Sequence, residues 1–386
     1  MHHRSVFVVA CLGMLVFGVV LTLLGSVLPG VLERFGIDMA AAGTLFLLMS
    51  FGILAGSLVF GPVTDRHGYK WMLAAAIALV FAGLEIIAFA PSLGWLRMGV
   101  AFIGFGGGII NGGTNALVAD ISGDERSARL SILGIFFGVG AVGVPFALSL
   151  LIGRASFDQL VAGVGAIVLI PLIATLVVRF PAPKQAQGFP LAAGAKLIRD
   201  PILLFFGLML FLESGLEITV GGWTATFFSQ ELGLTTDLAV RVLSLYWLGL
   251  MLARLVLGHL LRRVPPTRAL LGCIAIGLVG ALLMLGSRGV ATAAAGTFLL
   301  GVGFAATFPV VLGFVGERYP DLSGTAFSIV FVMALTGGML LPWATGVVGS
   351  TQGLRTSFLL VPSALVLLAL LVTFVSRHRA VAPAAG

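Results

Sequence analysis

Long apolar stretches dominate this chain, and short polar connections separate them. Each stretch has roughly 20 or more residues, the length an α-helix needs to cross the hydrocarbon core of a bilayer. No ten-residue alternation of apolar and polar positions occurs, so the pattern predicts membrane helices rather than a barrel. The twelve predicted spans are 5–32, 39–62, 71–90, 96–120, 130–152, 159–179, 202–229, 239–261, 268–286, 291–316, 323–348 and 356–376.

The second half of the sequence repeats the first at an offset of 197 residues. The aligned positions are mostly glycines, prolines and charges, which apolar chains do not match by chance. They include Gly18 with Gly215, Gly104 with Gly301, Asp120 with Glu317 and Pro145 with Pro342. A long fixed offset predicts two copies of one structural unit. Because each copy has six spans, we expect two six-helix halves related by a pseudo-two-fold axis along the membrane normal.

A linker rich in proline, glycine and lysine separates the two copies. Such a composition predicts a connector rather than another helix. The predicted domains are therefore an N-terminal half, the linker, a C-terminal half and a disordered tail. Their bounds are 1–179, 180–200, 201–379 and 380–386.

The composition excludes a soluble globule, since 59% of the residues are hydrophobic and only 10% are charged. The net charge of +7 does not indicate nucleic-acid binding, because the basic residues lie between spans rather than in one stripe. With the N-terminus inside, fifteen of the 22 basic residues fall on the cytoplasmic side. We expect a multi-pass protein of a bacterial inner membrane with both termini in the cytoplasm. Cys11 and Cys273 fall inside spans, which does not indicate a disulfide framework.

The loop after the second span carries the motif Gly61-Pro-Val-Thr-Asp65-Arg66-His-Gly68-Tyr-Lys70. Together with the twelve spans, the two halves and the linker, this loop resembles the major facilitator superfamily. That family carries glycine, Asp-Arg, glycine and basic residues between its second and third helices. The second half carries a degraded copy, Gly258-His-Leu-Leu-Arg262-Arg263, at the end of the eighth span. The resemblance implies that family's fold and transport by alternating access.

The repeat keeps an arginine and a carboxylate at matched positions near the cytoplasmic ends of four spans. We infer two ion pairs, Arg66–Asp120 and Arg263–Glu317, which with Asp65 would form a cytoplasmic gate. Such pairs can be favourable in one conformation and broken in another. The alternative is that these charges only anchor the topology.

Two carboxylates, Glu213 and Glu217, lie inside the seventh span, roughly 18 and 24 Å along the helix from Pro201. They are four residues apart and therefore share one helix face. Their repeat mates are Val16 and Val20, so the common scaffold does not require them. A carboxylate at this depth is protonated, paired or facing water. We predict proton coupling at Glu217 and Glu213, with structural acids as the alternative.

Arg254 in the eighth span is the natural partner for one of these acids. Counted from Arg263, it lies about 14 Å along the helix, closer in depth to Glu213 than to Glu217. We therefore expect a Glu213–Arg254 pair that leaves Glu217 free. The alternative is that Arg254 reaches the inner membrane surface.

Just beyond the acids, Gly221-Gly222 would allow the seventh helix to break and close over a ligand. We expect Trp223, the next residue, to pack against that ligand. Trp247 on the eighth span is a second aromatic that could stack on a sugar ring, although buried packing is the commoner role.

Two amides, Asn111 and Asn115, lie four apart in the fourth span, where their repeat mates are Phe308 and Leu312. Each amide can donate and accept a hydrogen bond, which suits a ligand rich in hydroxyl groups. Bonding between helices is the alternative.

These residues look like the fucose–galactose–glucose proton symporter branch and its sodium–glucose relatives. The resemblance implies that Asn115 matches a family asparagine. The acids that the branch carries in its first and fourth spans correspond here to Gly25 and Asn111. Proton coupling must then rest on the seventh-span acids, or be absent. Pro145 follows Val144 rather than glycine, which departs from the signature of drug–proton antiporters.

We therefore expect a secondary active transporter that takes up a sugar or similar polyhydroxylated solute, and not an enzyme. The substrate-binding residues would be Asn111, Asn115, Glu217, Trp223 and Trp247. We expect no cofactor, H⁺ as the coupling ion, a monomer in the lipid bilayer and no nucleic-acid partner. The alternatives are an exporter of amphiphilic drugs or metabolites, and a membrane receptor or enzyme that transports nothing.

Overall fold

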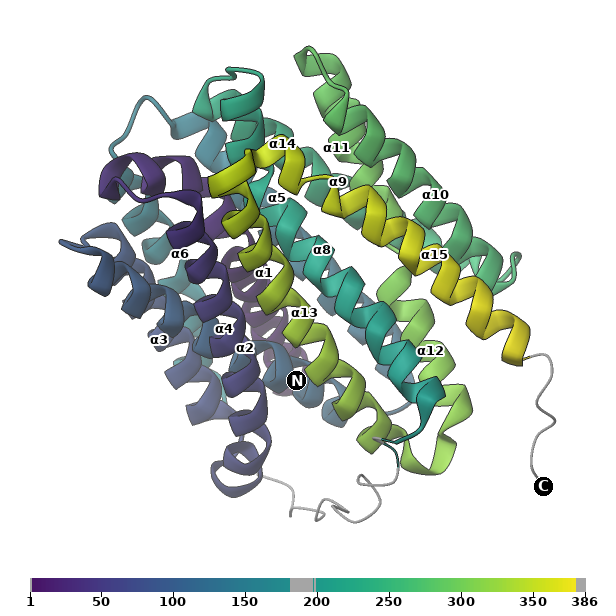
Figure 1. Ribbon diagram of the computed structural model, residues 1–386. Helices are drawn as coiled ribbons and strands as arrows, with labels where there is room; N and C mark the ends of the chain where they lie inside the picture. Colours follow the sequence, from purple (N-terminus) through teal and green to yellow (C-terminus); the bar gives the residue numbers. More distant parts are fainter. Residues whose placement is uncertain (1, 181–196, 198, 380–386) are drawn as a thin grey trace. The chain divides into compact units, whose positions relative to one another are not determined.

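The computed structural model describes residues 2–180, 197 and 199–379. Almost all of the predicted linker and the whole predicted tail, 380–386, lie outside the described residues. The first part of the chain forms α1 (His2–Phe35), α2 (Met39–His67), α3 (Tyr69–Ala88), α4 (Leu93–Ile121), η1 (Gly123–Glu125), α5 (Arg126–Leu151) and α6 (Phe157–Val177). The rest forms α8 (Pro201–Glu231), α9 (Thr236–Leu260), α10 (Pro266–Leu285), α11 (Val290–Phe304), α12 (Thr307–Arg318), η2 (Pro320–Leu322), α13 (Ser323–Gln352), α14 (Leu354–Ser357) and α15 (Leu360–Arg379). Figure 1 labels most of these helices.

Twelve helical segments of the described chain are long and apolar enough to cross a membrane. Each overlaps one predicted span, and the ends differ by a few residues. The tenth span, Val290–Arg318, contains both α11 and α12, and the twelfth, Leu354–Arg377, contains α14 and α15. The prediction of an all-α membrane protein with twelve spans is therefore confirmed.

The chain divides into two compact units. Unit 1 comprises Met1–Gln187 and Gly221–Ser244, and unit 2 comprises Gly188–Val220 and Leu245–Gly386. The units do not follow the predicted halves throughout, because the end of α8 and the start of α9 group with unit 1. The domain bounds drawn from the repeat stay a prediction.

Within each unit, glycines let paired helices approach until their backbones touch. In unit 1, a methyl group on Gly104 of α4 would overlap the carbonyl oxygen of Met49 on α2. In unit 2, a methyl group on Gly301 of α11 would overlap the carbonyl oxygen of Tyr246 on α9. These pairs are repeat mates at the same offset of 197 residues. The glycines that mark the repeat thus mark equivalent helix crossings, as small residues do in membrane bundles.

The tenth span is interrupted, whereas the seventh is not. Two turn residues, Ala305 and Ala306, separate α11 from α12. Pro309 explains the interruption, because a proline has no N–H and its ring clashes with the carbonyl four residues before it, here Ala305. By contrast, α8 runs unbroken through Gly221-Gly222. The break that these glycines would allow is not present in α8, because glycine permits a break but does not impose one.

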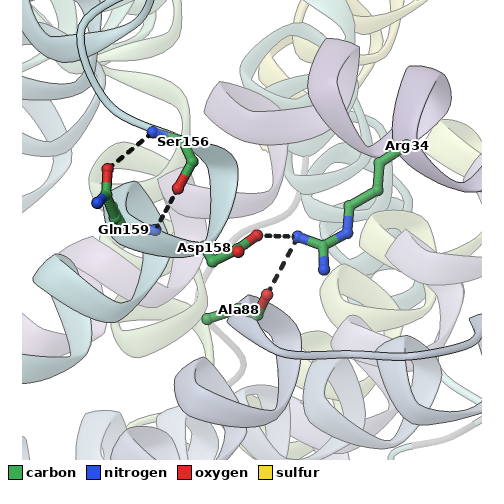
Figure 2. Close-up of polar contacts among 5 residues, drawn as sticks. All are labelled: Arg34, Ala88, Ser156, Asp158 and Gln159. Carbon is green, nitrogen blue, oxygen red and sulfur yellow. Dashed lines mark hydrogen bonds and ion pairs between the residues drawn. The ribbon is translucent and has the colours of Figure 1, made fainter.

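Local polar contacts fix the ends of several helices. Figure 2 shows α6 beginning with a capping box, in which Ser156 Oγ accepts from the Gln159 backbone and Gln159 Oε1 accepts from the Ser156 backbone. Beside it, Arg34 at the end of α1 pairs with Asp158 and donates to the carbonyl oxygen of Ala88, 3.2 Å away. These contacts join one end of α1, α3 and α6 within unit 1.

Asp200 fixes the start of α8, the helix that carries the two predicted acids. Its Oδ1 accepts from the Ile202 backbone at 2.9 Å, and its Oδ2 accepts from Tyr319 Oη at 2.7 Å. Burial, and then the hydrogen bond to Asp200, raises the pKa of the Tyr319 hydroxyl. The hydroxyl therefore stays neutral and keeps donating. Within unit 2, this contact ties the start of α8 to Tyr319, the residue that follows α12.

Candidate coupling and solute sites

An ion pair joins α8 to α9 inside unit 2. Arg254 Nη2 lies 3.3 Å from Glu217 Oε2, and the side chains are 33% and 14% exposed. Both residues belong to membrane spans, where a lone charge would be costly. In this ion pair, each of the two charges within the spans is neutralised by the other.

The expected Glu213–Arg254 pair is wrong, since Arg254 pairs with Glu217. A short connection, residues 232–235, joins α8 to α9, so the two helices run in opposite directions. Side chains lean toward the N-terminus of their own helix, so Arg254 and Glu217 lean toward each other. The depth estimate counted only the rise of the backbone and left out the direction of the side chains. Because the arginine side chain is long, Arg254 reaches the acid about one helical turn farther along α8 than that estimate predicted.

Glu213, one turn before Glu217, is the more deeply buried of the two acids. It is 1% exposed, and its Oε1 has no hydrogen-bond partner among the described residues. Glu213 also interacts electrostatically with Glu217 and Arg254. Arg254 thus interacts electrostatically with two neighbouring carboxylates and donates a hydrogen bond to one of them, Glu217.

Tyr246 of α9 completes this group, and the sequence analysis missed it. Its side chain is fully buried, and its Oη has no hydrogen-bond partner among the described residues. It lies within electrostatic range of Glu217, Glu213 and Arg254. The signal was present, because the repeat mate of Tyr246 is Met49. The same asymmetry between the halves that identified the acids would have identified this hydroxyl.

The two amides of α4 lie together in unit 1. Asn115 is exposed and Asn111 is half-buried. Asn115 Nδ2 donates to the backbone oxygen of Asn111 at 2.9 Å and to Asn111 Oδ1 at 3.1 Å. Both bonds stay within α4. Asn115 Oδ1 and Asn111 Nδ2 make no hydrogen bond to the described residues, so one acceptor and one donor of the pair have no partner there.

Both predicted aromatic contacts are buried. Trp223 is fully buried and packs on Phe46 of α2, with ring centroids 5.6 Å apart in unit 1. Trp247 is 2% exposed and packs edge-to-face on Tyr246 in unit 2, with centroids 5.0 Å apart. Their contact with a substrate stays a prediction.

The predicted gate residues are placed as follows. Asp120, near the end of α4, accepts a 2.8 Å hydrogen bond from Tyr69 Oη at the start of α3. Arg66 and Arg263 are exposed. The side chain of Asp65 lies outside the described residues. The pairs Arg66–Asp120 and Arg263–Glu317 stay predictions.

Twelve apolar spans in the described chain, two of them joined by a Glu–Arg ion pair, define a multi-pass membrane protein of the transporter class. The chain belongs to the Major Facilitator Superfamily, whose family model matches residues 10–333 and 225–386. The family prediction is confirmed.

Two curated relatives and one solved structure are similar over most of the chain. The mouse sodium-dependent glucose transporter 1A is 23% identical over 375 residues, covering 87% of each chain. The glucose/mannose transporter GlcP of Bacillus subtilis (strain 168) is 20% identical over 346 residues, covering 83% of this chain and 82% of the relative. The structure of the nucleoside transporter NupG aligns with a TM-score of 0.79 at 17% identity, covering 97% of this chain and 98% of that one.

Proposed function

We propose that this protein is a proton-coupled transporter of a polyhydroxylated solute and that it works by alternating access. The observation that carries the proposal is the group formed by Glu213, Glu217 and Arg254 inside the spans α8 and α9. Two relatives that are named glucose transporters support a sugar as the solute.

The coupling argument follows from the cost of buried charge. The Glu217–Arg254 pair is neutral as a whole, so it can stay ionised. Glu213 then has no cation of its own and is held neutral by a proton. If Arg254 moves from Glu217 toward Glu213, the proton passes to Glu217 or leaves to water. Exchange of Arg254 between the two acids would thus link proton binding to conformation.

The solute argument rests on the amides of α4. Asn111 Nδ2 and Asn115 Oδ1 offer one donor and one acceptor, which complements neighbouring hydroxyl groups that each donate and accept. The intrahelical bond between the two amides fixes both side chains in place before a solute arrives. Preorganisation of this kind lowers the entropic cost of binding.

The test uses purified protein in liposomes with a pH-sensitive dye inside. A sugar gradient should carry protons inward in the wild type, and Glu213→Gln should abolish this proton flux. Exchange of labelled sugar across the membrane should persist in Glu213→Gln, because a neutral amide imitates the protonated acid. Glu125→Gln, at an exposed acid in η1, is the control and should transport normally.

A sodium gradient is the competing driving force, since one relative is named sodium-dependent. If sodium drives accumulation and a pH gradient does not, the proton proposal is wrong. Proton flux in Glu213→Gln at the wild-type rate would also contradict it.

A further inference from the structure

A small groove opens at the C-terminal end of α3, apart from the acids and amides described above. Its volume is about 370 Å³, and its walls come from the end of α3, the turn that follows and the start of α4. The residues that line it are Glu85, Ile86, Phe89, Pro91 and Trp95. It therefore combines one carboxylate with an apolar and aromatic wall.

Glu85 belongs to the third membrane span, three residues before α3 ends at Ala88. This places it about 5 Å from the helix end, near the level at which a span meets lipid headgroups. Its carboxylate turns toward α6, where Gly165 leaves room for it. A methyl group on Gly165 would overlap Glu85 Oε1. The carboxylate is therefore held beside α6 instead of being extended into water.

Glu85 has no hydrogen bond or ion pair within the described part of the chain. The guanidinium that reaches this end of α3 belongs to Arg34, and it is already bound by Asp158 and the Ala88 carbonyl (Figure 2). An ionisable side chain in a span needs a counter-charge or a proton. None of the described residues provides that counter-charge to Glu85.

The two aromatic residues of the groove are suited to a cation. Phe89 and Trp95 are 62% and 50% exposed. The faces of such rings attract cations, and an indole also carries an N–H that can donate a hydrogen bond. A carboxylate and two aromatic rings in one groove therefore complement an ammonium group.

We propose that this groove binds the primary ammonium of an aminophospholipid headgroup. The ammonium donates hydrogen bonds to Glu85 and packs against Trp95 and Phe89, while the acyl chains lie along the apolar surface of α3. Lipid is the occupant because the groove lies at the end of a membrane span, beside the bilayer. A choline headgroup has no N–H to donate, so ethanolamine lipids bind in preference to choline lipids.

Native mass spectrometry of purified protein tests this with an equimolar mixture of phosphatidylethanolamine and phosphatidylcholine of identical acyl chains. The wild type should retain more of the ethanolamine lipid. Glu85→Gln should reduce the bound ratio about fivefold, the effect of losing an exposed charge pair and part of a cation–π contact. Glu33→Gln, at an exposed acid near the end of α1, should leave the ratio unchanged.

Gly165→Ala provides a second test that keeps the charge. The added methyl group displaces the Glu85 carboxylate from α6, so the lipid ratio should also fall.

If Glu85→Gln does not fold, Trp95→Ala at the exposed indole should reduce the ratio instead. The proposal fails if the wild type shows no preference or if Glu85→Gln keeps it. It also fails if soluble ethanolamine displaces the lipid at equal concentration, because the groove would then bind free amines.

Discussion

At the scale of single residues, the sequence identified the charged groups but not all of their contacts. The asymmetry between repeat mates singled out Glu213 and Glu217, and Arg254 was expected as the partner of one of them; the structure brings all three together in α8 and α9. The partner of Arg254 was wrong, because axial depth was counted along the backbone while the side chains lean along their helices. Tyr246 was overlooked, because a tyrosine among apolar residues is less conspicuous than a charge.

The Glu217–Arg254 contact should be measurable as a coupling energy. We expect the single changes Glu217→Gln and Arg254→Gln each to lower stability, because each leaves a largely buried charge without its partner. Arg254 is 33% exposed, so solvent screening limits the coupling to about 1 kcal/mol. A double-mutant cycle from thermal unfolding in detergent measures it. The control is Asp237–Arg241, an exposed pair at 3.9 Å that should couple by less than about 0.5 kcal/mol.

Zero coupling between Glu217 and Arg254 would mean that the contact contributes nothing to the folded state. A coupling that appears instead between Glu213 and Arg254 would restore the partner expected from the sequence.

For the amides of α4, we predict a change in solute affinity with little change in the stability of the fold. Asn115→Ala should weaken solute binding by about 1–3 kcal/mol, the cost of leaving a solute hydroxyl unpaired. Because Asn115 is exposed and its bonds stay within α4, the melting temperature should change little. Isothermal calorimetry with a panel of sugars and a melting curve provide both values. Unchanged affinity with a lower melting temperature would assign the amide to helix packing.

At the scale of elements, the apolar pattern predicted every span, because a bilayer demands one long apolar helix for each crossing. It did not predict the interruption at Ala305 and Ala306. The cause, Pro309, is visible in the sequence, but a proline within an apolar run can also be accommodated, as Pro145 is inside α5. Gly221-Gly222 does not interrupt α8. A glycine can serve close packing rather than flexibility. A methyl group on Gly222 would overlap the ring of Phe46 or press against it.

The glycine crossings should be essential to both units. Gly104→Ala should separate α4 from α2, and Gly301→Ala should separate α11 from α9, since each methyl group would overlap a backbone carbonyl that cannot move alone. We expect each change to cost about 1–3 kcal/mol, as overpacking does. Gly134→Ala and Gly272→Ala are matched controls, because a methyl group at either position meets nothing within 4 Å.

Thermal unfolding in detergent distinguishes these outcomes. The controls should be neutral or slightly stabilising, since alanine favours helices over glycine. If all four variants melt together with the wild type, the glycines are not needed for close packing.

At the scale of the whole molecule, the repeat and the loop after the second span were enough to predict the family. Both are set by the covalent sequence, so a single chain reveals them. The compact units are less predictable, because they divide α8 after Val220 and α9 after Ser244, within helices that the repeat treats as single elements. Which part of a long helix packs with which neighbours depends on tertiary contacts that the repeat does not encode.

The basic residues predict the orientation of the whole chain in the membrane, and two added cysteines can test that prediction. The excess of arginine and lysine in alternate loops predicts that both termini are cytoplasmic. Ser92, before α4, should then face outside, and Pro265, before α10, should face inside; both are exposed. Cys11 and Cys273 are buried and should not react, so the native chain serves as the background. A membrane-impermeant maleimide applied to intact cells should label Ser92→Cys at once and Pro265→Cys only after permeabilisation. If Pro265→Cys is labelled in intact cells and Ser92→Cys is not, the orientation is the opposite of the one predicted. The distribution of basic residues would then not determine it.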